Sequence, residues 1–304
     1  MFKKYPSIEN SYREKTINMF LEKYPQLKNE TYIVQEKLDG ANIQFIFSPD
    51  GSMQIASRNR IIDPDENFYS VWDVIYRDEY KKLIEAGKGY ARFWGYPVHI
   101  YGELYGKGIQ KRIDYGDDRY ISIFDMSVTT DDNNNVIFPP IYLMNSDVSD
   151  YIVKNYGVFD SLQEALDFVP NNWNNIEGVV IKPYHNVYYS PQGSIFYLKN
   201  KNPNFEEKGN KPKKEKKQNF SDSVEHLHSE FGKYINENRV LSVFSKMGEI
   251  QDDKQIGEYI KAVIEDAKND FIDDGNSVDS LDQKEIKYVY NHSKSVVQIL
   301  RKYL

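Results

Sequence analysis

The chain has 304 residues, 40% of them hydrophobic, and a formal net charge of −7. This length allows one large and one small domain, and the acidic balance argues against a protein that coats nucleic acid, although it leaves room for local basic patches. The absence of cysteine excludes disulfides and thiolate metal sites, and fits a reducing cytoplasm. No apolar stretch is long enough to span a bilayer or to serve as a secretion signal, so we expect neither membrane insertion nor secretion.

The first two hundred residues predict a mixed structure. A helix is predicted over residues 12–24, and residues 32–201 consist mostly of short stretches with alternating apolar positions, such as Ile43, Phe45 and Phe47. Such alternation is typical of strands in twisted antiparallel sheets. Further helices are predicted over 69–86, 146–156 and 161–168, and the Asp-Asn run at 131–135 predicts a turn between two strands. The predicted fold class is α+β.

A lysine-rich segment follows this region. Residues 206–220 contain six lysines and few apolar residues, which predicts a linker between a domain of residues 1–205 and a second domain of residues 221–304. The linker is either a solvated tether or a contact for phosphate groups of a nucleic acid, and the sequence favours neither. The second domain carries Val224, Leu227 and Phe231 at helical spacing, so we expect it to be a small helical domain.

The strongest chemical signal is the motif Glu36-Lys37-Leu38-Asp39-Gly40, placed directly after an apolar strand. A lysine at a strand end before a glycine turn is held in a concave site. An amine acts as a nucleophile only when it is deprotonated, so a catalytic lysine needs nearby cations or burial. Taken alone, this short motif is more often a surface hairpin than a catalytic site.

Four further motifs follow in order, each beside a strand-like segment: Ser57-Arg58, Tyr101-Gly102-Glu103-Leu104, Glu177-Gly178-Val179-Val180-Ile181-Lys182 and Leu198-Lys199-Asn200-Lys201. Attack on the α-phosphorus of a nucleoside triphosphate needs an amine, cations against the developing charge, and carboxylates for metal and ribose. The set supplies each of these groups. It resembles the covalent nucleotidyltransferase superfamily of DNA ligases, RNA ligases and mRNA capping enzymes.

Within that superfamily the chain most resembles the type-two RNA ligases of large bacteriophages, which seal nicks in duplex RNA and are related to trypanosome editing ligases. The resemblance covers nearly the whole chain, including residues 1–5, 106–111, 114–117 and 245–250. It implies an adenylyltransferase domain of the ATP-grasp-like ligase nucleotidyltransferase fold, followed by a small all-helical domain. It also implies an ATP-dependent RNA ligase that uses Mg²⁺ or Mn²⁺ and joins 3'-OH and 5'-phosphate RNA ends in a duplex or on a template strand. We expect a monomer, acting in the cytoplasm of an infected host cell.

Carried over by position, the resemblance implies a role for each motif residue. It assigns AMP attachment to Lys37, adenine contacts to Glu36 and Phe124, a ribose or phosphate contact to Arg58, and ribose binding to Glu103. It assigns metal binding to Glu177, phosphate contacts to Lys182, Lys199 and Lys201, the joining of the 3'-hydroxyl to the activated end to Asn42, and an RNA contact to Arg239. One departure is Asp39, which stands where the phage type-two ligases carry histidine and where DNA ligases and capping enzymes commonly carry aspartate.

Three alternatives stay open. A DNA ligase or a capping enzyme uses the same lysine chemistry, but typically continues into an OB-type β-barrel, where this chain continues into helices. An NAD-dependent ligase usually carries an extra domain before its nucleophile, and only 36 residues precede Lys37, which favours ATP. An inactive RNA-binding module of the same fold would be expected to have lost the nucleophile or the metal carboxylate.

Read singly, Phe124 is more typical of a core residue, and the five histidines show no metal-site spacing.

Overall fold

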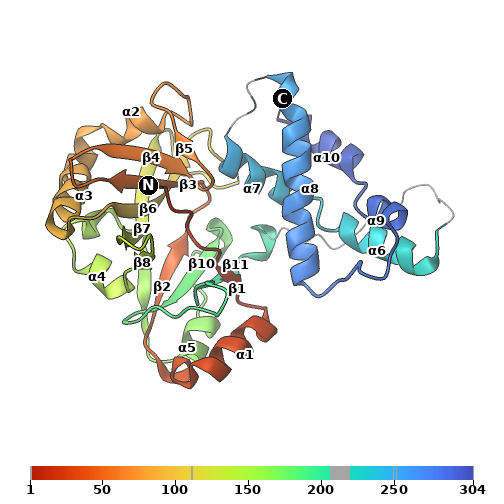
Figure 1. Cartoon of the computed structure of the whole chain (residues 1–304), viewed down its shortest axis with the longest axis horizontal. Helices are drawn as coiled ribbons and strands as arrows, with labels where there is room; N and C mark the ends of the chain where they lie inside the picture. Colours follow the sequence, from red (N-terminus) through yellow and green to blue (C-terminus); the bar gives the residue numbers. More distant parts are fainter. Residues whose placement is uncertain (1, 111, 206–219, 249, 251, 304) are drawn as a thin grey trace. The chain divides into compact units, whose positions relative to one another are not determined.

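The structure, a computed structural model, describes residues 2–110, 112–205, 220–248, 250 and 252–303 (Figure 1). The chain divides into two compact units, Met1–Asn202 and Pro203–Leu304. This division lies close to the predicted domain end at residue 205, whereas the predicted linker falls, apart from Phe220, outside the described residues. No described helix is long and apolar enough to cross a membrane.

The first unit contains a six-stranded sheet in the order β5-β4-β3-β6-β7-β8, in which all neighbours are antiparallel. Its strands are β3 (Ala41–Phe47), β4 (Met53–Ser57), β5 (Ile61–Ile62), β6 (Val98–Gly106), β7 (Arg119–Thr129) and β8 (Asn135–Ile137). The predicted alternation on β3 is confirmed, because Ile43, Phe45 and Phe47 are fully buried in one core. Helices α2 (Val71–Ile75) and α3 (Lys81–Trp94) pack on that core (Figure 1).

A second sheet of five strands has the order β1-β11-β10-β2-β9. Its strands are β1 (Glu9–Asn10), β2 (Tyr32–Lys37), β9 (Asn155–Phe159), β10 (Gly178–Pro183) and β11 (Leu198–Lys201). One face packs against α1 (Glu14–Lys23) and α5 (Leu162–Asp167), with Phe20, Val34 and Ile181 in the shared core. Side chains alternate between the faces of a strand, so Ile33, Gln35 and Lys37 point away from this core. That opposite face carries the candidate site.

The predicted helices were partly correct. The first is α1, and the last is α5. The segment predicted as one helix over 69–86 is α2, a 3-10 turn (Asp78–Tyr80) and α3, which ends where Gly95 adopts a left-handed conformation (φ 70°).

The predicted helix over 146–156 was wrong. Its middle is a 3-10 turn (Ser149–Tyr151), and its end belongs to β9. The cause is tertiary, because residues 155–159 pair with β2 at the edge of the five-stranded sheet, and this pairing satisfies backbone groups that a helix would otherwise satisfy locally. The remaining short helices of the first unit are α4 (Pro140–Met144), Pro25–Asn29 and Trp173–Asn175.

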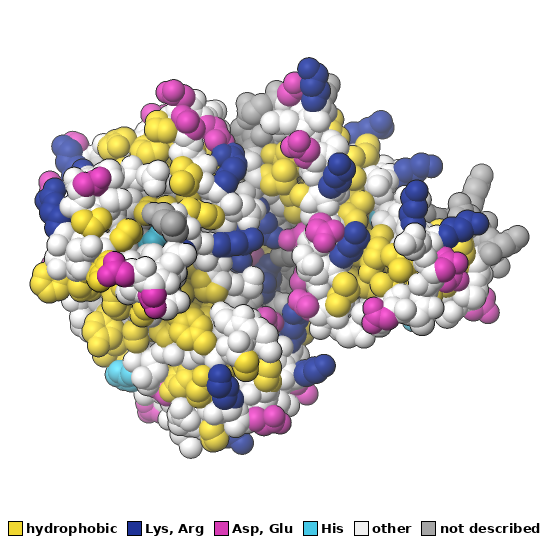
Figure 2. All heavy atoms as spheres, in the orientation of Figure 1, with side chains coloured by type: hydrophobic (Ala, Val, Ile, Leu, Met, Phe, Trp, Pro, Cys, Tyr) yellow, Lys and Arg dark blue, Asp and Glu magenta, His cyan; other side chains and the backbone are white. Residues whose placement is uncertain are grey.

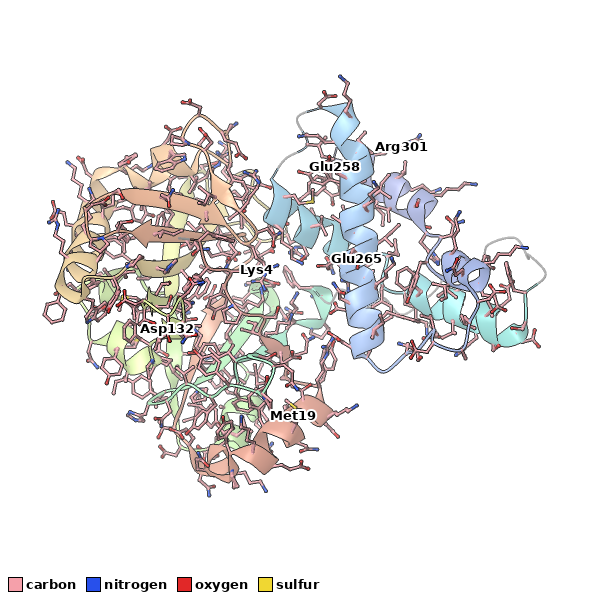
Figure 3. The ribbon with its side chains drawn as sticks, viewed as in Figure 1. Lys4, Met19, Asp132, Glu258, Glu265 and Arg301 are labelled. Atoms are coloured by element: carbon pink, nitrogen blue, oxygen red, sulfur yellow. The ribbon has the colours of Figure 1, made fainter. Side chains whose placement is uncertain are left out.

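The predicted turn at residues 131–135 is confirmed. It connects β7 to β8, and Asn133 adopts a left-handed conformation (φ 63°) that asparagine tolerates well. Asp132 in this turn accepts hydrogen bonds from Thr130 and Asn134, and is labelled in Figure 3.

The described residues of the second unit form helices, turns and loops, and no strand. Its helices are α6 (Asp222–Gly232), α7 (Glu237–Met247), α8 (Ile256–Asp273), α9 (Gln283–Val289) and α10 (Ser293–Leu300), with 3-10 turns at Pro203–Phe205 and Asp253–Gln255. Val224 and Phe231 lie in its core and Leu227 packs against it, which confirms the predicted helical spacing. On α8, Glu258 and Glu265 are exposed and lie two turns apart on one side of the helix (Figure 3).

Candidate active site

Lys37 is the last residue of β2, and its side chain is partly buried. Its Nζ lies 2.6 Å from Oε2 of Glu177, the residue directly before β10. The strand register explains this contact, because Lys37 lies opposite Gly178 across the β2–β10 pair. The structure therefore brings together the nucleophile and the metal carboxylate that the sequence predicts, although they are far apart along the chain.

Lys201 completes this arrangement from the next strand. It lies opposite Gly178 across the β10–β11 pair, and its Nζ is 3.3 Å from Oε1 of Glu177. Residues opposite one another share a face of the sheet, so Lys37 and Lys201 project from the same face on either side of Gly178. A Cβ at Gly178 would lie 2.2 Å from the carbonyl oxygen of Asn200, so the close approach of β10 and β11 requires glycine there.

Glu177 is buried and carries a charge that two lysines and one arginine stabilise. Burial raises the pKa of this carboxyl, but Lys37, Lys201 and Arg112 together outweigh burial and lower the pKa below its ordinary value. The carboxylate is therefore ionised at neutral pH. It is the negative centre around which the basic groups of the site are arranged.

Glu103 and Asn42 come from the six-stranded sheet. They lie opposite each other on β6 and β3, and therefore share one face of that sheet. The pKa of Glu103 is raised to about 8, chiefly by burial and also by the carboxylates Glu177 and Asp39, while Lys37 and Arg58 oppose the rise. These mutual effects place Glu103 in the same electrostatic environment as the Lys37 site.

Lys182 and Asp125 form a buried ion pair between the two sheets. Lys182 Nζ lies 2.9 Å from Asp125 Oδ2 and donates to the carbonyl oxygen of Phe124 at 2.8 Å. Burial lowers the pKa of Lys182, and Asp125 opposes this change. Lys182 is only 1% exposed, so in this structure its amine is engaged inside the domain, not presented to a phosphate.

Phe124 occupies a bulge in β7. Tyr101 and Gly102 on β6 pair with Asp125 and Ile123, which leaves Phe124 as the extra residue. Bulges next to active sites redirect side chains, and the Phe124 ring is partly buried, 5.3 Å from the ring of Tyr5. The adenine contact expected of Phe124 stays a prediction, and so does the core role that its apolar surroundings suggest.

The remaining predicted pocket residues are Arg58, Lys199 and Glu36. Arg58 follows β4, and its Nη2 lies 3.4 Å from Ser7 Oγ. Lys199 lies opposite Val180 and so shares the face of Lys37 and Lys201. Glu36 points to the other face of β2 and accepts a hydrogen bond from Tyr156 at 3.0 Å.

Asp39 has a partner that the sequence did not indicate. Asp39 is 2% exposed, and Arg112 donates to both of its carboxylate oxygens, with Nε 2.9 Å from Oδ2. Burial raises the pKa of Asp39, Glu177 adds to the rise, and Arg112 opposes it. Arg112 directly follows residues 106–111, whose resemblance to the phage ligases was the only sign in the sequence that this region belongs to the site. No pattern in the sequence links positions 39 and 112.

The donors fit a divalent ion held together with a nucleotide. Among the described residues, no group of three or more His, Asp or Glu side chains could hold a metal ion. Mg²⁺ is commonly bound by one or two carboxylates plus substrate phosphates and waters, and Glu177 supplies one ionised carboxylate beside the nucleophile. The site therefore suits a metal that arrives with the triphosphate.

Arg239, the predicted RNA contact, lies in the core of the helical unit. It is 1% exposed, its Nη2 lies 2.8 Å from Asp270, and its Nη1 donates to Asp266 at 2.5 Å. Its Nε donates to the carbonyl oxygen of Tyr234 at 2.8 Å. These bonds connect α7 to α8, and a direct contact of Arg239 with RNA would require both ion pairs to open.

The visible surface shows no face of a single charge. Figure 2 shows basic, acidic and apolar side chains interspersed over the visible face of each unit, in keeping with the acidic net charge of the whole chain. The concentration of positive charge that phosphate binding needs is local, on the face that carries Lys37, Lys199 and Lys201.

Family models match most of the chain. A model described as RNA ligase matches residues 30–201, which is more than half of the sequence, and a model described as T4 RNA ligase 2 C-terminal matches residues 217–299. The chain therefore belongs to the RNA ligase family. The match of the helical unit to the T4 RNA ligase 2 C-terminal model supports the predicted resemblance to the phage type-two members of that family.

Solved structures of an RNA ligase from Naegleria gruberi are similar to this chain. A mutant of that ligase with ATP and Mn gives a TM-score of 0.46 at 16% identity, over 66% of this chain and 57% of that chain. An apo mutant gives 0.46 at 17% identity over 67% and 57%, and the ligase with PPi gives 0.44 at 16% identity over the same shares. This chain thus spans less than two thirds of the length of those proteins.

Proposed function

We propose that this chain is an ATP-dependent RNA ligase that joins a 3'-hydroxyl to a 5'-phosphate RNA end. The observation that carries the proposal is the placement of Lys37 at a strand end, 2.6 Å from the ionised Glu177, with Lys201 on the other side of that carboxylate. Membership of the RNA ligase family supports RNA as the substrate.

In the first step the Nζ of Lys37 attacks the α-phosphorus of ATP. The Lys37 ammonium gives up a proton to water before the attack. A nitrogen–phosphorus bond then forms as the nitrogen releases a second proton to water, the bond from the α-phosphorus to the bridging oxygen breaks, and pyrophosphate leaves. The ion pair with Glu177 holds Nζ in place, and Lys199 and Lys201 lie on the same face to stabilise negative charge on phosphate oxygens. A divalent ion beside Glu177 would neutralise charge on the phosphates.

One transfer of the AMP group and one displacement of AMP follow. An oxygen of the RNA 5'-phosphate attacks the lysine-bound phosphorus, which restores the Lys37 amine. The RNA 3'-hydroxyl then attacks the activated 5'-phosphate, forms the phosphodiester and displaces AMP. Asn42 lies opposite Glu103 on the neighbouring strand, and we assign to it an action in this last step.

The helical second unit supports an RNA ligase over the two nearest alternatives. DNA ligases and capping enzymes typically continue into an OB-type barrel, whereas the second unit, as far as it is described, contains helices only. We propose a monomer that acts on ends held in a duplex or by a template strand. The expected location in the cytoplasm of an infected cell stays a prediction.

A sealing assay tests this proposal. Three nicked duplexes, all RNA, all DNA and an RNA/DNA hybrid, are incubated with protein, ATP and Mg²⁺, beside unpaired RNA strands and with Lys37→Ala as control. We expect sealing of the nicked RNA duplex and none with Lys37→Ala. Sealing of the DNA nick alone would identify a DNA ligase, and sealing of unpaired strands alone would contradict the duplex preference.

A further inference from the structure

The turn directly after Lys37 is anchored by a buried ion pair. Asp39 lies two residues beyond the nucleophile, and Arg112 donates to both of its carboxylate oxygens. The Asp39 side chain is 2% exposed and that of Arg112 is 15% exposed. A two-bond pairing of a guanidinium with a carboxylate fixes orientation as well as distance, and neither lysine nor a neutral side chain reproduces it.

Two further contacts fix the same turn. The backbone N–H of Asp39 donates to the hydroxyl of Tyr115 at 3.0 Å, and the ring of Tyr115 packs on that of Tyr105 at 4.9 Å. Gly40 packs so closely on β6 that a Cβ there would lie 2.4 Å from the carbonyl oxygen of Leu104. The segment after β6 thus holds both the backbone and the side chain of Asp39, and Lys37 lies at the start of the turn so held.

The charges around the turn explain why an arginine is needed. Glu177 disfavours ionisation of Asp39, and Glu177 and Asp39 both disfavour ionisation of Glu103, so the turn lies in a field of several carboxylates. Lys37 and Arg112 act on both Asp39 and Glu177. If Arg112 were neutral, Asp39 would be a buried carboxylate without its main cation, and it would compete with Glu177 for the ammonium of Lys37.

We propose that Arg112 is a positioning residue for the nucleophile: by pairing with Asp39 it holds the turn, and it leaves Lys37 paired with Glu177 and in line for the α-phosphate. Arg112 acts through Asp39 and makes no contact with the nucleotide. This inference rests on the proposed function, because it concerns the formation of the lysyl-AMP.

The test compares four proteins: the native chain, Arg112→Gln, Asp39→Asn and the double variant. Single-turnover formation of the covalent AMP adduct is followed over a range of ATP concentrations. We expect Arg112→Gln to lower the rate at saturating ATP by about ten- to a hundredfold, as a displaced reactive group does, with little change in the half-saturating ATP concentration. The double variant leaves no buried charge unpaired, and Gln can still donate one hydrogen bond to Asn, so we expect part of the lost rate to return.

A matched control is Arg77→Gln. Arg77 also makes two bonds to an aspartate, Asp118 at 2.8 and 3.1 Å, but this pair is more exposed and touches no residue of the Lys37 site. We expect the native adduct rate from Arg77→Gln. All rates are measured well below the lowest melting temperature among the variants, so that loss of fold is not read as loss of positioning.

Three results would overturn the inference: a native rate for Arg112→Gln, a double variant as slow as Arg112→Gln, or a raised half-saturating ATP concentration, which would mean that Arg112 binds the nucleotide. If Arg112→Gln fails to fold, Arg112→Lys is used in its place. A rate lowered less than tenfold, with an unchanged half-saturating ATP concentration, would then support positioning. An unchanged rate or a raised half-saturating ATP concentration would overturn it. Failure of the proposed function has a different signature, since the native chain itself would then form no adduct.

Discussion

Glu103 makes the free energy of unfolding depend on pH. Burial raises its pKa to about 8, from an ordinary value of 4.5. Between these values the folded protein keeps a proton that the unfolded chain has released. The free energy of unfolding therefore contains a contribution that is fully present below about pH 4.5 and is lost as the pH rises to about 8.

Replacing Glu103 with glutamine removes this ionisation. We expect Glu103→Gln to melt at a temperature closer to that of the native protein at pH 5, and about 2–4 °C above it at pH 8. We expect adduct formation to fall in the same variant, because the carboxyl is assigned to ribose binding. Melting curves at pH 5, 6.5 and 8 measure the first effect, and a stability difference that does not grow with pH would contradict the assigned pKa.

Lys182 is predicted to contact a phosphate, but in the structure it forms a buried ion pair, and substitution of Lys182 distinguishes these two roles. Its amine is buried with Asp125, and removal of one partner of a buried ion pair costs about 3–5 kcal/mol. We therefore expect Lys182→Met to lower the free energy of unfolding by that amount in urea titrations. Lys199→Met, on the same face but partly exposed, serves as control: we expect weaker ATP binding and little change in stability. Native stability with weakened ATP binding in Lys182→Met would restore the phosphate contact that the sequence predicts.

Among single residues, the sequence could indicate those site residues whose neighbours are determined by the register of paired strands. Lys37, Glu177 and Lys201 belong to short motifs beside strands, and pairing of those strands brings them together. Arg112 was missed because its contact with Asp39 depends on the path of the segment after β6, which no periodicity describes. The burial of Arg239 was missed because a residue's surroundings in a helical core depend on how the helices pack.

Among the elements, α3 shows how closely a helix must approach the sheet that carries Asn42. Gly87 faces β3, and a Cβ there would lie 2.3 Å from the ring of Phe47, whereas a Cβ at Gly89 would meet nothing within 4 Å. The two glycines lie two residues apart on one helix. They therefore form a matched pair for substitution.

We expect Gly87→Ala and Gly89→Ala to change stability in opposite directions. Gly87→Ala overpacks the core and lowers the free energy of unfolding by about 1–3 kcal/mol. Gly89→Ala replaces a flexible residue in an open helical position and raises it by about 0.5–1 kcal/mol. Urea titrations decide the matter, and equal effects of the two substitutions would contradict the described packing of α3 on β3.

Local sequence patterns predict some of these helices and strands but not others. Alternation on β3 and helical spacing on α6 follow from burial of one face, so they were correctly predicted. Residues 146–156 carry no such unambiguous pattern, and β9 exists because the edge of β2 offers backbone partners. Only the three-dimensional arrangement makes those partners available.

At the scale of the whole molecule, the residues that we assign to formation of the lysyl-AMP all lie in one of the two units. Lys37, Glu103, Glu177 and Lys201 all belong to the unit Met1–Asn202, while the match to the T4 RNA ligase 2 C-terminal model lies in the other unit. We expect the fragment 1–202 to form the covalent AMP adduct and to seal nicked RNA more slowly than the full chain. A folded fragment, checked by circular dichroism, that forms no adduct would show that the second unit is needed for the first step.

The most direct test of the account is covalent labelling with ATP that carries radioactive phosphorus at the α-position, in the presence of Mg²⁺. The native chain and Lys37→Ala are compared after denaturing electrophoresis, with GTP and NAD as alternative donors. The account predicts label on the native protein from ATP and none on Lys37→Ala. Absence of label on the native protein with all three donors, or equal label on Lys37→Ala, would contradict it.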